Sequence, residues 1–131
     1  MKGSSNGDLM NQILFVGMIA IFLFVLVPKL KVLIFGSDDP LPNGVIIDVR
    51  TKGEWDYDHI DGAILIPDYS IGSMITSKVP DKTTPINLYC ASGMRASSAK
   101  SKLKSMGYTN VSNIGGISSA RTKLLKQKRT L

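Results

Sequence analysis

The chain has 131 residues, a formal net charge of +6, one histidine and one cysteine. This length accommodates one domain with an appendage. A lone cysteine excludes an internal disulfide, and one cysteine with one histidine falls short of a zinc ligand set, so no metal and no other cofactor is expected.

The charge is unevenly distributed along the chain. Residues 37–84 hold nine acidic and four basic side chains, whereas residues 85–131 hold nine basic side chains and no acidic one. The basic half should attract anions. Its tail, residues 121–131, could also rest on anionic lipid headgroups. No nucleic acid is expected as a partner, because aromatic side chains are not interleaved with the charges.

The N-terminal part contains the most apolar segment. Residues 1–12 are expected to form a polar, disordered lead, and residues 13–30 a transmembrane anchor. The uncharged run 13–27 covers only about 22 Å as a helix, but the stretch 9–30 reaches membrane length. A cleaved secretory signal and a buried core helix are the alternatives. No small-x-small cleavage site follows Val27, which favours a retained anchor.

The side of the membrane stays open at this point. Lys29 and Lys31 follow the apolar segment, while Lys2 and the α-amino group precede it and are opposed by Asp8. This count favours a cytoplasmic domain by a margin of about one charge. The expectation is a single-pass protein of a bacterial inner membrane, with the domain on either the periplasmic or the cytoplasmic side.

Residues 31–44 are expected to be a linker, because Gly, Pro and Asp are frequent there, and residues 45–131 to be the globular domain. Alternating patterns in that domain predict a mostly parallel α/β sheet flanked by helices. Strands are expected at residues 45–49, 63–67, 86–90 and 110–114. Helical segments are expected within 51–63, 68–79, 96–107 and 118–128, with a turn at Gly115 and Gly116.

Cys90 lies at the end of an expected buried strand, directly before a helix. Ligands of open α/β sheets bind at the carboxyl ends of the strands. Backbone amides of the loop and the helix dipole can converge there, and both favour a thiolate and a bound anion. Gly93 permits a tight turn, and Arg95 supplies a planar cation suited to an oxyanion. A lone cysteine is more often a small buried hydrophobe, but this position favours a functional thiol.

Three ordered motifs resemble the rhodanese (thiosulfate sulfurtransferase) family. The loop matches its Cys-x-x-Gly-x-Arg pattern, residues 46–67 match its Asp-Val-Arg and His-Ile-x-Gly-Ala stretch, and residues 103–116 match its helix end and Gly-Gly strand. The resemblance covers about residues 45–117 and is greatest to the single-domain branch typified by phage shock protein E. That branch is typically exported, which favours the periplasm, against the lysine count.

The resemblance implies a rhodanese-like fold and a two-step sulfur transfer. Cys90 would take the outer sulfur of a small anionic donor such as thiosulfate and pass it, as a persulfide, to cyanide or a thiol. The loop amides would surround this sulfur, Arg95 would bind the anionic end of the donor, and Asp48 and Arg50 would order the loop. His59 is expected to be structural. The implied substrate-binding residues are Ala91, Ser92, Gly93, Met94 and Arg95.

Two other functions remain open from the sequence. A cysteine phosphatase or arsenate reductase would use a similar loop, but those signatures place five residues between cysteine and arginine, and here there are four. The shorter loop suits a sulfur atom better than a tetrahedral oxyanion. The third possibility is a non-catalytic rhodanese-fold module that docks a partner at the membrane. The leading hypothesis is a membrane-tethered sulfurtransferase.

Overall fold

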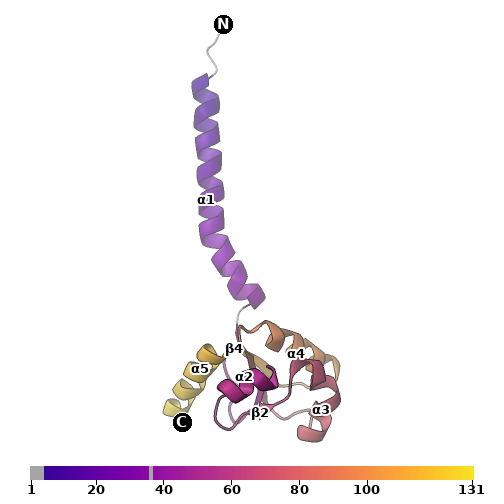
Figure 1. The fold of residues 1–131 in the computed structure, drawn as a ribbon. Helices are drawn as coiled ribbons and strands as arrows, with labels where there is room; N and C mark the ends of the chain where they lie inside the picture. Colours follow the sequence, from indigo (N-terminus) through magenta and orange to yellow (C-terminus); the bar gives the residue numbers. More distant parts are fainter. Residues whose placement is uncertain (1–4, 36) are drawn as a thin grey trace. The chain divides into compact units, whose positions relative to one another are not determined.

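The computed structural model describes residues 5–35 and 37–131. The chain divides into two compact units at Gly36, the first containing the helix α1 (Ser5–Phe35) and the second spanning Ser37–Leu131. Figure 1 shows the single helix of the first unit and the mixed α/β arrangement of the second. The second unit contains the cysteine loop.

Helix α1 has 31 residues and is therefore about 46 Å long. Its stretch Gly7–Phe24 has a mean hydropathy of 1.8, and by length and composition it could cross a membrane; a secretory signal would meet the same criteria. Apolar side chains along this stretch are exposed, with Phe15 at 66% and Phe24 at 84%. The helix extends past the apolar run at both ends. Residues 5–12, expected as a disordered lead, are helical, while residues 1–4 of that lead lie outside the described part.

The second unit is built on a four-stranded parallel sheet in the order β2-β1-β3-β4. This confirms the α/β class and the parallel sheet expected from the sequence. All four strands lie at the expected places, although β2 is shorter than its apolar run. The strands are β1 (Val45–Asp48), β2 (Ile64–Leu65), β3 (Ile86–Cys90) and β4 (Val111–Gly116).

Helices pack against both faces of this sheet. A short 3-10 turn (Asp68–Ser70) leads into α3, and the helices of this unit are α2 (Lys52–Tyr57), α3 (Ile71–Lys78), α4 (Met94–Ser105) and α5 (Ile117–Thr130). Side chains of β3 alternate between the two faces, because successive residues of a strand point to opposite sides. Leu88 and Cys90 pack toward α3 and α4, whereas Tyr89 packs toward α5.

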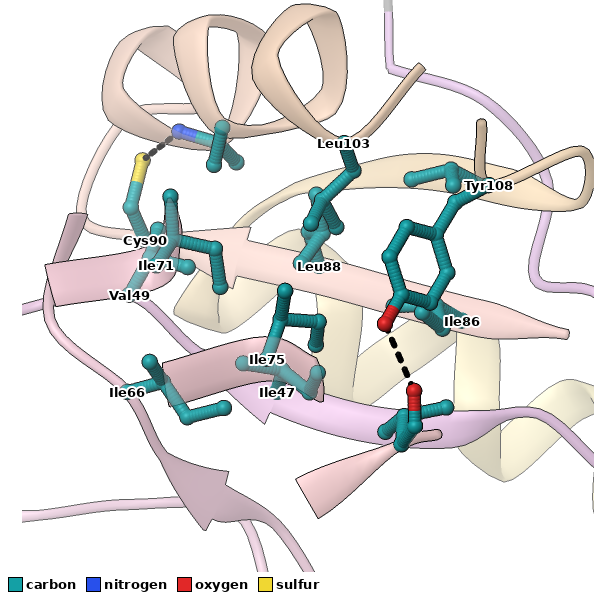
Figure 2. Packing of buried hydrophobic residues seen from close by; sticks show 14 residues of the cluster. Ile47, Val49, Ile66, Ile71, Ile75, Ile86, Leu88, Cys90, Leu103 and Tyr108 are labelled. Atoms are coloured by element: carbon teal, nitrogen blue, oxygen red, sulfur yellow. Dashed lines mark hydrogen bonds between the residues drawn. The ribbon is translucent and has the colours of Figure 1, made fainter. Parts of the chain in front are cut away.

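The larger core lies between the sheet and the helices α3 and α4 (Figure 2). Ile47 and Leu88 of the sheet meet Ile75 of α3 and Leu103 of α4, and all four are fully buried. Tyr108 closes this core, and its buried hydroxyl donates a hydrogen bond of 2.6 Å to the Val79 carbonyl. Fully burying a Leu or Ile side chain contributes about 1.5–3 kcal/mol to the free energy of unfolding, so this layer fixes the position of β3.

Residues 37–44 differ from the linker expected there. The amide of Asp38 donates to the Asn113 carbonyl at 2.6 Å, and Asn87 exchanges two hydrogen bonds with the backbone of Leu41, at 2.8 and 3.0 Å. The Gly- and Pro-rich composition marks irregular backbone, and irregular backbone can still be packed when side chains satisfy its polar groups. The domain therefore begins at Ser37 rather than at Val45.

Two local boundaries also differ from the sequence expectation. Helix α4 begins at Met94, two residues earlier than expected, because Gly93 stands before it with a φ of +94°. Gly115 and Gly116 lie in β4 rather than in a turn. The β3–β4 register shifts between Leu88 and Tyr89, so Tyr89 pairs with Gly115 and Cys90 with Gly116. This irregularity brings the glycines beside the cysteine.

Candidate active site

Cys90 is the last residue of β3, and its thiol points toward the start of α4 (Figure 2). The Gly93 amide donates a hydrogen bond to Cys90 Sγ at 2.9 Å, and the Ala96 amide donates one at 3.5 Å. Cys90 is fully buried. Two backbone donors at the positive end of a 12-residue helix stabilise negative charge on the sulfur.

The loop between Cys90 and α4 is only three residues long, from Ala91 to Gly93, because α4 begins at Met94. The left-handed φ of Gly93 turns its amide back toward the sulfur, a conformation that favours glycine. Of the five residues expected to surround the sulfur, Gly93 provides an amide contact in the structure, and Ala96, which the sequence interpretation missed, provides the second.

Strand β4 supports the loop from the side. Asn113 donates from Nδ2 to the Gly93 carbonyl at 3.0 Å and accepts from the Gly115 amide at 3.0 Å. Gly116 lies so close that a Cβ there would stand 2.4 Å from the Ala91 carbonyl oxygen. The φ of Gly116 is −75°, so the requirement for glycine is one of space rather than of backbone strain. No local sequence pattern predicts this role of Asn113, because its partner Gly93 lies 20 residues earlier.

Replacing Gly116 by alanine should therefore displace the loop. We expect Gly116→Ala to lower the rate of reactions at Cys90 Sγ by roughly 10²-fold, the usual cost of moving reacting groups by about 1 Å. The measurement is the rate of covalent modification of Cys90, followed by intact mass. Gly53→Ala is the matched control, since nothing lies within 4 Å of the Cβ it would add. Equal rates in Gly116→Ala and the wild type would contradict this role.

Arg95 lies in the first turn of α4 and forms a bidentate ion pair with Glu54 of α2. The two N···O distances are 2.7 and 2.9 Å, and each side chain is about one-third exposed. Hydrogen bonds from Arg95 lower the pKa of Glu54 to about 2, against the opposing effect of burial. The sequence interpretation left Arg95 free for an anion and did not single out Glu54. The Thr51-x-x-Glu54 spacing predicts a helix cap, but it does not predict that Glu54 pairs with Arg95, which lies 41 residues away.

Asp48 and Arg50 form a buried pair at the end of β1. Arg50 Nη2 lies 2.8 Å from Asp48 Oδ2, and the Arg50 backbone amide donates to Asp48 Oδ1 at 2.9 Å. The guanidinium also donates to the Asp58 carbonyl and lies 5.6 Å from the centre of the Tyr89 ring. Burial raises the pKa of the Tyr89 phenol, whose oxygen accepts from the Ile60 amide. The pair therefore stabilises the turn after β1 and contacts Tyr89, the residue that precedes Cys90.

The remaining sequence candidates lie around this centre in different roles. Ala91, Ser92 and Met94 are exposed, so their side chains form the outer surface of the loop. His59 stacks on Trp55 with ring centroids 3.7 Å apart, and its Nδ1 lies 2.9 Å from the Trp55 carbonyl oxygen. This places His59 at the end of α2, as a residue that caps a local turn.

A separate groove lies at the other end of the strands. It has a volume of about 380 Å³ and lies between α5 and the starts of β1 and β3, where it is lined by Gly44, Asn87 and Leu124 among others. None of its lining residues belongs to the Cys90 loop. The groove is therefore distinct from the site at the carboxyl ends of the strands.

Comparison with known proteins identifies the family. Residues 31–122 match the model of the rhodanese-like domain. The chain is 41% identical over 71 residues to thiosulfate sulfurtransferase PspE of Escherichia coli, covering 54% of this chain and 68% of that protein. It is 33% identical over 90 residues to a yeast (Saccharomyces cerevisiae) thiosulfate:glutathione sulfurtransferase, covering 60% and 63% of the two.

Solved structures agree with the sequence matches. A structure of an E. coli rhodanese with anions aligns with a TM-score of 0.57 and 38% identity, covering 58% of this chain and 89% of that one. The matched region contains the parallel sheet and the cysteine loop, and the family model covers more than half of the sequence. The chain with Cys90 at the end of β3 therefore belongs to the rhodanese family of sulfurtransferases.

Proposed function

We propose that this chain is a membrane-tethered sulfurtransferase that carries sulfane sulfur as a persulfide on Cys90. The observation that carries this proposal is the position of Cys90 Sγ, 2.9 Å from the Gly93 amide at the start of α4. Sγ accepts hydrogen bonds from two backbone amides, and the thiolate is the form of a cysteine that attacks another sulfur. Two relatives named for thiosulfate sulfur transfer support the same reaction here.

In the first step the Cys90 thiolate attacks the outer sulfur of thiosulfate. A bond forms between the two sulfurs, the S–S bond of thiosulfate breaks, and sulfite leaves with the electron pair. The negative charge then lies on the outer sulfur of the persulfide, and the positive end of α4 beside Cys90 would stabilise it. Cys90 is buried and the neighbouring loop residues Ala91 and Ser92 are exposed, so the donor would approach the thiol over these two residues.

In the second step a thiophilic acceptor attacks the outer sulfur of the persulfide. With cyanide, the new C–S bond gives thiocyanate, the persulfide S–S bond breaks, and the electron pair returns to Cys90 as a thiolate. A thiol acceptor reacts in the same way and leaves as a persulfide. The protein thus alternates between two covalent states and needs one sulfur atom of its own.

The tether in this proposal is α1. Its Gly7–Phe24 stretch is long and apolar enough to span the hydrocarbon core, and the large apolar side chains along it are exposed. Exposed side chains of this kind, from Leu9 to Phe24, are stable in contact with lipid but unfavourable in contact with water. A retained helix would keep the sulfur carrier at one membrane surface.

One experiment tests transfer and tethering together. The protein is recovered from the membrane fraction, incubated with thiosulfate, and its intact mass is measured before and after cyanide is added. We expect a mass that includes α1, a gain of one sulfur atom with thiosulfate, and loss of that sulfur with cyanide as thiocyanate appears. A mass lacking α1 contradicts the tether. Absence of both the sulfur adduct and thiocyanate contradicts sulfur transfer.

A further inference from the structure

Arg95 is the one basic residue of segment 90–95, and in the structure its guanidinium forms an ion pair with Glu54. Both terminal nitrogens of the guanidinium donate to the carboxylate, at 2.7 and 2.9 Å. A bidentate pair of this geometry uses the face with which arginine ordinarily binds an oxyanion. A donor anion that approaches Arg95 therefore meets a cation whose charge is already balanced.

Glu54 is held in this position by its own helix. Its Oε1 accepts from the Thr51 amide at 3.3 Å and from the Thr51 hydroxyl at 3.1 Å, while Thr51 Oγ1 accepts from the Glu54 amide at 3.3 Å. This is a reciprocal capping box, which fixes the carboxylate at the N-terminus of α2. With a pKa of about 2, Glu54 keeps its negative charge throughout the neutral range.

A second carboxylate acts on the same guanidinium. The pKa of Arg95 is raised chiefly by the hydrogen bonds to Glu54, and the charges of Cys90 and Asp68 act in the same direction. Asp68 belongs to a different element, the 3-10 turn before α3. The net charge of Arg95, Glu54 and Asp68 is −1, so this part of the site repels a donor in proportion to the donor's negative charge.

We propose that Glu54 determines donor specificity, by neutralising Arg95 and so favouring singly charged sulfane-sulfur donors over doubly charged ones. This inference rests on the proposed sulfur transfer and concerns the choice among its donors. Thiosulfate carries two negative charges. An organic thiosulfonate, such as methanethiosulfonate, carries one and reacts by the same step, in which the Cys90 thiolate takes the outer sulfur and a sulfinate leaves with the electron pair.

The test compares the rates at which these two donors load sulfur onto Cys90 in the full-length protein in detergent. In Glu54→Gln, which can still cap α2 and bind Arg95 through its amide oxygen, we expect the second-order loading rate to rise about tenfold with thiosulfate and about threefold with methanethiosulfonate. The larger gain for the dianion follows because the Coulomb energy doubles with the donor's charge. Higher ionic strength should shrink both gains.

Asp68→Asn gives a second route to the same result, because it removes a charge that acts on Arg95 without removing the ion pair. We expect a smaller rise in the loading rate than in Glu54→Gln, and again a larger rise with thiosulfate than with methanethiosulfonate. Asp56→Asn is the matched control: it removes one charge from α2 at a residue whose partner is Lys52 rather than Arg95, so the donor ratio should be unchanged.

Three outcomes overturn the inference. Equal changes for both donors in Glu54→Gln, or slower loading with both, would mean that Glu54 serves to hold Arg95 in place. An equal shift of the donor ratio in Asp56→Asn would mean that overall charge, rather than the pair, governs the choice. If neither donor loads sulfur onto the wild-type protein, sulfur transfer itself fails together with this inference, whereas normal loading with an unaltered ratio removes the inference alone.

Discussion

Cys90→Ser is expected to abolish sulfur transfer. Serine keeps an acceptor for the Gly93 and Ala96 amides, so the loop should remain folded, but an alkoxide forms no persulfide. Removing a nucleophile of this kind lowers turnover by roughly three orders of magnitude or more. The measurement is thiocyanate formation from thiosulfate and cyanide, together with the intact mass of the protein.

The control for this substitution is Ser97→Ala, which changes an exposed residue of α4 and should keep the wild-type rate. Thiocyanate formation by Cys90→Ser at the wild-type rate would contradict the role of the thiol. A Cys90→Ser chain that lost transfer but kept its full effect in cells would favour the docking module over the enzyme. The phosphatase alternative would be supported by turnover of an aryl phosphate.

Asp48→Ala is expected to cause the largest loss of stability. Asp48 is fully buried and Arg50 is 5% exposed, so the substitution leaves a guanidinium buried without its counter-charge. Breaking a buried pair in this way costs about 3–5 kcal/mol of the free energy of unfolding. For a domain of this size, Tm should fall by more than about 12 °C. Trp55, the sole tryptophan of the sequence, reports unfolding by its fluorescence.

The matched control is Asp56→Ala, which breaks the exposed pair with Lys52 and should change the free energy of unfolding by less than about 1 kcal/mol. A double substitution, Asp48→Ala with Arg50→Met, should recover part of the loss, because it removes the unpaired charge. Similar Tm values for Asp48→Ala and Asp56→Ala would mean that the buried pair does not brace the turn after β1.

The features that the sequence predicted correctly are those encoded by neighbouring residues. The apolar run of β3 ends at Cys90, a glycine follows within the loop, and the α4 pattern begins directly after it. Neighbouring residues therefore suffice to predict that the thiol lies at the end of a strand. The parallel sheet followed from strands that alternate with helices. Asp48 and Arg50 are both buried at the end of β1, and their ordering of the Cys90 loop stays a prediction.

The features that the sequence did not reveal depend on contacts between distant residues. Glu54 reaches Arg95 across 41 positions, and Asn113 reaches Gly93 across 20. No local pattern encodes such partners. Residues 37–44 resemble a linker in composition, but their backbone polar groups are bonded by residues far along the chain, such as Asn87, 46 positions from Leu41, and Asn113, 75 positions from Asp38. The helix start was misplaced because the left-handed φ of Gly93 begins α4 earlier than its apolar face does.

The burial of Cys90 has a consequence for the lifetime of the proposed persulfide. A persulfide next to a second thiol can collapse to a disulfide and release hydrogen sulfide, but this sequence has one cysteine and offers no such neighbour. The sulfur is also enclosed between β3 and the start of α4, where bulk oxidants have little access. If the proposed transfer holds, the loaded form should therefore decay slowly by itself and discharge when an acceptor arrives, and the protein would store activated sulfur as well as transfer it.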